Sequence, residues 1–401
     1  MIGRRDFIKA SVWLGAGSAA GFSAAEPIKN VMLPFANGAR PLVAYPGKRP
    51  LIRLTARPPQ LETPFEIFDQ GVLTPNDAFF VRYHLADIPL QIDPQSYRIS
   101  VGGAVANPLS LTLDQLKKDF EPVEIVAVNQ CSGNSRGYVE PRVGGGQLAH
   151  GAMGNARWRG VSLKSVLDKA GVKAHALSVG FNGLDRPVLP ETPDFMKSLE
   201  VDHARDGEVM LAYAMNGSDL PMLNGFPLRL IVPGYYGTYW VKHLSDITVL
   251  EKPLDSYWMN VAYRIPDNAC ACTPVGKLAD ATTPISRLTI RSFITNVVDG
   301  QRVAASKTFA LRGIAFDGGA GVDKVEVSTD EGSSWRAAQL GDDLGKYSFR
   351  EWRLSTPLST GAHVLMARAT NAQGQTQPLD PLWNPSGYGR NVVERLRVQA
   401  S

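Results

Sequence analysis

A single cysteine, Cys131, stands in a polar loop whose residue types could bind a metal or attack an electrophile. The loop reads CSGNSR over residues 131–136 and directly follows the apolar stretch 123–128, so it is expected at the end of a strand. Arg136 is five residues away, and a nearby cation favours the thiolate, the form that attacks or binds metals. A soft sulfur ligand suits a transition metal. From the pattern alone, a functional thiolate and a structural cysteine explain Cys131 about equally well.

The other two cysteines, Cys270 and Cys272, form a C-x-C pair. Three cysteines are too few for a scaffold held together by disulfides. The pair could form a strained disulfide or stay reduced, and we expect a structural or incidental role because one intervening residue gives poor disulfide geometry. Neither belongs to a C-x-x-C-H sequence, so no covalently attached haem is expected in this chain.

Residues 1–25 are predicted to be a removable export signal. Arg4 and Arg5 precede the apolar run 10–22, and the small residues 23–25 follow it. The paired arginines resemble the twin-arginine signal, which exports folded proteins to the periplasm. An ordinary secretory signal with two basic residues is the alternative. The apolar run is short, and no later stretch supplies about 20 continuous apolar residues, so no membrane span is expected in the mature protein.

The overall charge excludes some classes of partner. The chain has 42 Lys and Arg against 38 Asp and Glu, and the resulting formal net charge of +4 is small for 401 residues. The basic residues are scattered, which indicates neither a nucleic-acid-binding nor an anionic-membrane surface. The charge is compatible with a small anionic substrate.

The pattern of apolar residues predicts an α+β fold in two domains. Residues 26–57 are expected to form an extended arm, and the rest of the first domain, to residue 280, alternates short apolar runs with two short helices at 111–117 and 162–167. A Thr or a Ser at each helix start suits an N-cap. From residue 281 to 401, two-residue alternation and Gly-rich turns predict an all-β sandwich of immunoglobulin-like type.

Several motifs resemble those of the sulfite oxidase family. The loop CSGNSR (131–136) is similar to the family's C-x-G-N-x-R segment, and FFVRYHL (79–85) is similar to its F-x-x-R-N-H motif. Further similar stretches are GLD at 183–185, LAYAMNG at 211–217, GFPLR at 225–229 and VKHL at 241–244. The resemblance implies that residues 26–280 form a mixed α/β molybdopterin-binding catalytic domain of sulfite-oxidase type.

The resemblance also implies roles for individual residues. Cys131 becomes the ligand of a molybdenum that a pyranopterin also holds. The positions expected to bind the pterin cofactor are Arg82, Tyr83, His84, Asp185, Asn224, Arg229 and Lys242. A pterin phosphate is well served by Arg and Lys donors.

Four residues are expected to act on the substrate. Arg82 and Arg136 would bind a small dianion, Tyr263 resembles the family's active-site tyrosine, and Trp258 would replace the tryptophan that is missing after the cysteine loop. The chain also departs from the family by having Tyr83 in place of Asn and Asn224 in place of His. These departures concern the shape of the substrate pocket more than the cofactor.

The implied activity is oxidation of sulfite to sulfate, as in a bacterial sulfite dehydrogenase with a c-type cytochrome as acceptor. That cytochrome would be a haem subunit or a soluble protein, since no haem is expected in this chain. A sulfane dehydrogenase of a thiosulfate-oxidising system is the nearest alternative. A molybdenum-dependent methionine sulfoxide reductase ordinarily lacks the C-terminal sandwich, and an adhesion-type binding protein would leave the cysteine loop unexplained.

Overall fold

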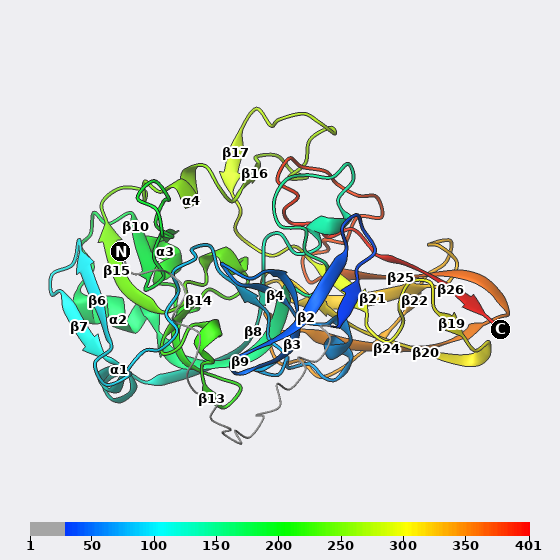
Figure 1. Cartoon of the computed structure of the whole chain (residues 1–401), viewed down its shortest axis with the longest axis horizontal. Coiled ribbons are helices and arrows are strands. Elements are labelled where there is room, and N and C mark those ends of the chain that lie inside the picture. The colour runs from blue at the N-terminus through cyan, green and yellow to red at the C-terminus, as the bar shows by residue number, and fades with distance from the viewer. Residues whose placement is uncertain (1–28) are drawn as a thin grey trace, which may run out of the picture.

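The protein is rich in β-strands, with few and short helices (Figure 1). The structure, a computed structural model, describes residues 29–401, so the predicted export signal at 1–25 lies outside the described residues. Within this range no helix is both long and apolar enough to cross a membrane. The first half of the chain has less helix than the α+β prediction suggested, because its α-helices are few and short.

One sheet of the first half positions the cysteine loop. It has the strand order β13-β12-β9-β8, with β14 paired to β12. Its strands are β8 (Pro122–Gln130), β9 (Met153–Ser162), β12 (Met210–Met215), β13 (Ser218–Asp219) and β14 (Arg229–Ile231). Because β8 ends at Gln130, Cys131 begins the loop that leads towards β9, as the sequence predicted.

A second sheet has the order β11-β10-β15-β6-β7 and packs on the same apolar core. Its strands are β6 (Arg98–Gly103), β7 (Leu109–Thr112), β10 (Ser178–Gly183), β11 (Lys197–Glu200) and β15 (Leu244–Leu250). The short helices are α1 (Leu113–Asp119), α2 (Leu163–Ala170), α3 (Val201–Ala204) and α4 (Tyr257–Asn260). The short 3-10 helices are η1 (Phe65–Asp69), η2 (Arg136–Tyr138), η3 (Met222–Asn224) and η4 (Gly237–Tyr239).

Both predicted helices form near the predicted places, and local signals explain their starts. Thr112 caps α1 by accepting a hydrogen bond from the Gln115 amide, and the Gln115 side chain accepts one from the Thr112 amide in return. Helix α2 follows Ser162, whose side chain makes no capping hydrogen bond, so that part of the prediction was wrong. The helix ends at Gly171, whose φ of 70° lies in the left-handed region that favours glycine.

The predicted extended arm is part of a sheet. Residues 29–57 contribute three strands to a five-stranded antiparallel sheet, and Leu51 and Ile52 of its third strand are buried. The strands are β1 (Asn30–Met32), β2 (Ala39–Tyr45), β3 (Lys48–Thr55), β4 (Gln60–Glu62) and β5 (Val81–Arg82). Pairing satisfies the backbone groups that a lone arm would leave to solvent. The sheet also holds Arg82 in place through the pairing of β5 with β4.

The C-terminal half consists of two sheets that share one core of side chains, including Leu311, Trp352 and Leu365. One sheet contains β18 (Arg291–Ile294), β20 (Ser306–Phe316), β23 (Gln339–Leu340) and β24 (Arg350–Leu358). The other contains β19 (Arg302–Val303), β21 (Val322–Ser328), β22 (Arg336–Ala337), β25 (Gly361–Asn371) and β26 (Arg395–Ala400). The all-β character agrees with the sequence, and the immunoglobulin-like type stays a prediction.

A hairpin stands at the predicted linker between the halves. Strands β16 (Arg264–Pro266) and β17 (Thr282–Pro284) pair antiparallel and enclose the loop 267–281. Cys270 and Cys272 form a disulfide in this loop, which answers the question that the sequence left open. Cys131 is the free cysteine.

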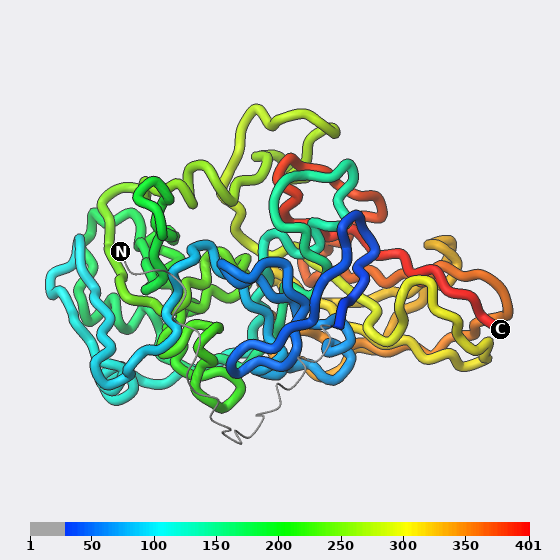
Figure 2. The backbone as a smooth tube through the Cα atoms, in the orientation of Figure 1, coloured from blue at the N-terminus to red at the C-terminus, as the bar shows by residue number. Residues whose placement is uncertain are grey.

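The segment 383–394 of the C-terminal half lies against the cysteine loop, and Figure 2 shows the two tubes side by side. The Gly389 amide donates to the Ser132 carbonyl at 3.2 Å, and the Trp383 indole donates to the Pro141 carbonyl at 3.0 Å. The two halves are therefore joined at the loop that carries Cys131.

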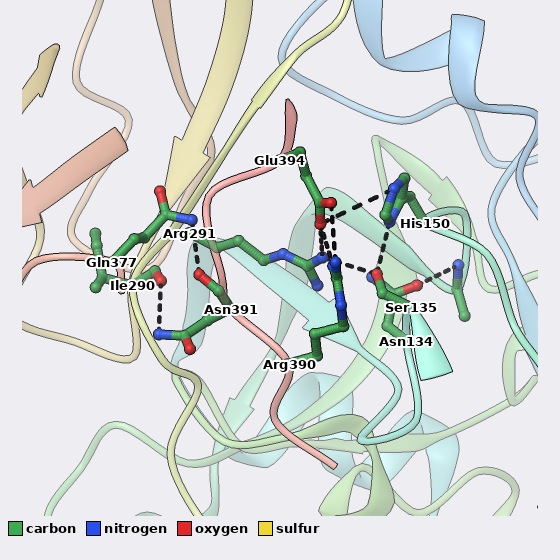
Figure 3. A network of polar contacts seen from close by, with 10 residues as sticks. Asn134, Ser135, His150, Ile290, Arg291, Gln377, Arg390, Asn391 and Glu394 are labelled. Carbon is green, nitrogen blue, oxygen red and sulfur yellow. Dashed lines mark hydrogen bonds and ion pairs between the residues drawn. The ribbon is translucent and has the colours of Figure 1, made fainter. Parts of the chain in front are cut away.

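A buried ion-pair network, which we call the interdomain clamp, fixes this junction (Figure 3). It consists of Ser135, His150, Arg291, Arg390 and Glu394. The Glu394 carboxylate accepts hydrogen bonds from Arg390 and, at 2.9 Å, from Arg291, whose side chain is only 1% exposed. Arg291 also donates to the Ser135 hydroxyl at 2.8 Å, and that hydroxyl is 2.7 Å from His150 Nδ1. The clamp thus connects the C-terminal half to the cysteine loop.

Electrostatics set the charge state of the clamp. Burial by itself raises the pKa of the Glu394 carboxyl, but its charged neighbours Arg390 and Arg291 help to lower it to about 2. Glu394 therefore stays ionised at neutral pH. Removal of one partner from a buried ion pair leaves an uncompensated charge, which is strongly destabilising.

We predict that Glu394→Gln lowers the free energy of unfolding by roughly 3–5 kcal/mol at pH 7, because Arg291 loses its counter-charge. The folded-state pKa of about 2 lies below the ordinary 4.5, so the stabilisation is present above pH 4.5 and is lost as the pH falls towards 2. Urea unfolding of both proteins between pH 7 and pH 3 should show the difference shrinking. The exposed Glu121→Gln is the control, and equal stabilities at pH 7 would contradict the role of the clamp.

Candidate active site

The cysteine loop is held tightly by backbone and side-chain hydrogen bonds. The Cys131 amide donates to the Ala152 carbonyl at 2.9 Å, and the Cys131 carbonyl accepts from the Asn134 amide at 2.9 Å. Asn134 Oδ1 accepts from the Ala152 amide at 3.0 Å. Cys131 is 8% exposed, so its sulfur is fixed on a rigid loop at the wall of a cavity.

The cavity beside Cys131 gathers most of the residues that the sequence predicted for the site. It lies between β5 of the N-terminal sheet and the ends of β8 and β14. The predicted residues that line it are Arg82, His84, Cys131, Asn224, Arg229, Lys242 and Tyr263. Asn129, Ser132, Thr238, Phe195 and Trp240 also line it.

Three other predicted residues lie close behind this lining. Tyr83 is fully buried, and its hydroxyl is 2.6 Å from His243 Nε2. Asp185 is buried, and burial raises the pKa of its carboxyl, while Lys242 opposes this. Trp258 packs its ring 5.0 Å from that of His84 and donates to the Pro193 carbonyl at 3.2 Å. The structure thus places them next to the cavity rather than in its wall.

Arg136 points away from the cavity towards the C-terminal half. Its Nε donates to the Ser386 carbonyl at 2.9 Å, and its guanidinium carbon lies 4.7 Å from the centre of the Tyr388 ring. The position in the motif gave no indication of this direction, because Ser386 and Tyr388 are about 250 residues further along the chain. Direct binding of an anion by Arg136 stays a prediction.

Three cations gather at the cavity without an ion pair to a carboxylate in the described part of the chain. Lys48 and Arg229 are buried and Lys242 is half-buried, and none of the three is in an ion pair with a residue in the range 29–401. Burial lowers the pKa of Lys48 and of Lys242 to about 7 and that of Arg229 to about 10. Buried charge without a partner is unfavourable. The cavity is therefore arranged to receive an anionic group.

Several polar atoms around the cavity also lack partners in the described part of the chain. They are Arg229 Nε, Ser132 Oγ, Thr238 Oγ1 and both side-chain atoms of Asn129. Buried polar groups in folded proteins are nearly always hydrogen-bonded. These atoms indicate a polar ligand with both donors and acceptors.

The cations are held in fixed positions by the backbone. Lys48 Nζ donates to the Phe79 carbonyl at 2.9 Å and to Asn224 Oδ1, and Asn224 donates to the Phe80 carbonyl at 3.0 Å. Lys242 Nζ donates to the Arg82 carbonyl at 2.7 Å. The charges are thus preorganised around the strand that carries Arg82.

The opposite wall is aromatic and holds a hydrogen-bonded pair. Tyr263, whose φ of 60° is unusual for a tyrosine, bonds through its hydroxyl to His84 Nε2. Phe195 stacks on the His84 ring with 3.8 Å between ring centres. Burial lowers the pKa of His84 well below its usual range, and burial raises that of Tyr263. His84 is therefore neutral and Tyr263 protonated at pH 7.

Sequence reasoning missed three residues of the site. Lys48 lies on β3 in the supposed arm, and Phe195 and the fully buried Lys197 lie in or next to β11. Lys197 Nζ donates to the Trp258 carbonyl at 2.7 Å and lies 5.5 Å from the centre of the Tyr263 ring. No local motif marks any of them, because their partners are distant in sequence.

Comparison with known proteins identifies the class of this site. The family model "Oxidoreductase molybdopterin binding domain" matches residues 84–258, and "Mo-co oxidoreductase dimerisation domain" matches residues 282–401. The chain is thus a molybdopterin-binding oxidoreductase.

Relatives define the family. Human mitochondrial sulfite oxidase is 33% identical over 381 residues, which cover 90% of this chain and 68% of the human protein. Sulfite oxidase of Gallus gallus is 32% identical over 365 residues, covering 86% of this chain and 78% of the chicken protein. The chain belongs to the sulfite oxidase family.

A solved structure shares the fold. The sulfane dehydrogenase SoxCD of Paracoccus pantotrophus superposes with a TM-score of 0.74 and covers 96% of this chain and 93% of its own, at 22% sequence identity. This likeness agrees with the sulfite-oxidase-type fold expected from the sequence.

The residues present fit the molybdenum–molybdopterin cofactor that the family implies. A phosphorylated pterin is anionic and rich in donors and acceptors, which matches the unpaired cations and the unpartnered polar atoms of the cavity. Cys131 offers the soft sulfur that molybdenum would need. The individual ligand and contact roles stay predictions.

We predict that Lys242→Met weakens retention of the cofactor about ten- to a hundredfold, because a charge-assisted contact is lost. The same change should raise the melting temperature of the cofactor-free chain, since an unpaired buried charge is replaced by an apolar side chain. Molybdenum per chain and thermal unfolding measure the two effects.

Lys307→Met, at an exposed position of β20, is the matched control and should change neither quantity. If Lys242→Met lowers both the molybdenum content and the melting temperature of the cofactor-free chain, the cation has a structural role instead.

Proposed function

We propose that this protein oxidises sulfite to sulfate at a molybdenum–molybdopterin centre and passes the electrons to a c-type cytochrome. The observation that carries the proposal is the cavity beside Cys131, with its uncompensated cations, in a chain one-third identical to sulfite oxidases over most of its length. In chemical balance, sulfite and water give sulfate, two protons and two electrons.

The residues of the cavity would divide between cofactor and substrate. Cys131 would hold the metal through its sulfur, and Asn224, Arg229 and Lys242 would bind the pterin and its phosphate. When bound, the cofactor supplies oxygen-atom transfer and two-electron redox chemistry.

Arg82 and Tyr263 are the groups best placed to act on sulfite. Arg82 has a half-buried guanidinium at the cavity and would attract and orient the dianion. Tyr263 stays protonated, and with the tautomer of His84 that carries its proton on Nε2, the imidazole donates to the Tyr263 oxygen. The Tyr263 hydroxyl can then donate its own proton to an oxygen of the substrate from a fixed position. Phe195 and Trp258 pack around this pair and limit the access of water.

Sequence features support the proposed cell compartment and electron acceptor. The twin-arginine pattern at Arg4 and Arg5 supports export of the folded protein to the periplasm. No C-x-x-C-H sequence occurs in the chain, which favours a separate c-type cytochrome, either as a haem subunit or as a soluble acceptor.

Oxidation of carrier-bound sulfane sulfur is the second candidate, because SoxCD shares the fold over 96% of this chain. Reduction of methionine sulfoxide is less well supported, since the C-terminal half matches the dimerisation domain of the family. An adhesion-type protein would not account for the match of residues 84–258.

We predict about one molybdenum per chain and rapid sulfite-dependent reduction of cytochrome c.

Cys131→Ser replaces the soft ligand and should abolish this activity while the fold is kept, because the loop is held by backbone contacts. Elemental analysis, a cytochrome c assay and circular dichroism measure the three outcomes. Full activity of Cys131→Ser would exclude a ligand role, and activity only on sulfane substrates would favour the second candidate.

We predict that Arg82→Gln raises the KM for sulfite about ten- to a hundredfold, because a charge-assisted contact is worth roughly 1.5–3 kcal/mol. Arg98→Gln, at an exposed position of β6, is the control. Steady-state kinetics measure both variants. An unchanged KM in Arg82→Gln would place the anion site elsewhere.

A further inference from the structure

Tyr388, a residue of the C-terminal half, lies in the turn at 384–389 and packs against Tyr263 in the wall of the cavity. Asn384 closes this turn by donating to the Tyr388 carbonyl at 2.9 Å and accepting from the Tyr388 amide at 3.2 Å. The neighbouring Gly389 amide is bonded to the Ser132 carbonyl, next to Cys131. The Tyr388 backbone is therefore fixed relative to the cysteine loop.

The Tyr388 ring contacts two residues that the sequence assigned to the substrate. It stacks on Tyr263 with 5.4 Å between ring centres and 12° between planes. The Arg136 guanidinium lies 4.7 Å from its centre, a favourable position for a cation over an aromatic ring. Tyr388 is thus the link between an arginine outside the cavity and the tyrosine in its wall.

The close packing of the turn explains why Arg136 has this direction. Gly387 has a φ of 58°, and a Cβ there would lie 2.6 Å from Val143 and 3.0 Å from Arg136. Only glycine lets the turn approach this closely. The Arg136 side chain is consequently enclosed between its own loop and the turn, where it also donates to the Gly146 carbonyl.

The interdomain clamp holds the Tyr388 turn in place against the cysteine loop. Arg390 and Glu394 follow Tyr388 by two and six residues, and the clamp connects them through Arg291 to Ser135 of the cysteine loop (Figure 3). The turn is thereby anchored on one side by Asn384 and Gly389 and on the other by a buried ion pair.

We propose that Tyr388 is a positioning residue of the active site, whose ring holds Tyr263 and Arg136 in one stack and thereby fixes the face of the cavity that binds the oxyanion. Tyr388 does not line the cavity itself and acts through these two residues. This inference rests on the proposed oxidation of sulfite.

The test compares Tyr388→Leu, which removes the flat ring, with Tyr388→Phe, which keeps it, in the full-length molybdenum enzyme. Two quantities are measured: the kcat and KM for sulfite, and the Kd of sulfate for the resting enzyme by calorimetry, which needs no turnover. Tyr388→Leu should raise both KM and Kd about tenfold with a smaller change in kcat. Tyr388→Phe should keep both near the wild-type values.

Trp335→Ala is the matched control. Trp335 is a half-buried aromatic residue of the same half with its own arginine contact, Arg368 at 4.1 Å, and it does not line the cavity. It should leave the KM and the Kd unchanged. A purely structural role for Tyr388 would lower the melting temperature and leave sulfate binding unaltered, and that result would overturn the proposal.

A double-mutant cycle tests whether Arg136 and Tyr388 act together. We expect the sulfate Kd to rise in Arg136→Met and in Tyr388→Leu, and the effect of the double variant to differ from the sum of the two, because both residues act through the same stack. Independent, additive effects would contradict the proposal. If the wild-type enzyme neither oxidises sulfite nor binds sulfate, the proposed function fails, whereas a functional wild type matched by Tyr388→Leu refutes only the role of Tyr388.

Discussion

The arrangement of this protein depends on positive charge buried around one cysteine. Lys48, Arg229 and Lys242 gather at the cavity beside Cys131 without an ion pair to a carboxylate in the described chain, and burial lowers the pKa of each. Such a cluster is unfavourable by itself, so an anionic ligand would relieve it. Binding of the cofactor and stability of the fold should therefore be coupled.

The surrounding elements serve to hold these groups. Strand β8 delivers Cys131, the N-terminal sheet holds Arg82 on β5, and the interdomain clamp secures the cysteine loop from the C-terminal side. Because the clamp and the Tyr388 turn belong to the same segment, the C-terminal half contributes to the geometry of the site as well as to the bulk of the molecule.

The sequence predicted what short-range patterns determine. The Thr112 cap marked the first helix, and the position of Cys131 after an apolar run marked the loop. Long-range contacts were beyond it. Lys48 bonds to Asn224 across 176 residues and Arg136 to Ser386 across 250, so neither the role of Lys48 on β3 nor the direction of Arg136 had a local signal.

X-ray absorption at the molybdenum edge tests the central claim most directly, because it counts the sulfur atoms bound to the metal in the loaded protein. We expect the molybdenum in Cys131→Ser to lose one sulfur neighbour relative to the wild type while the remaining sulfur shell is kept, since the pterin stays bound by the buried cations. The same sulfur count in both proteins would show that Cys131 does not hold the metal and would contradict the account.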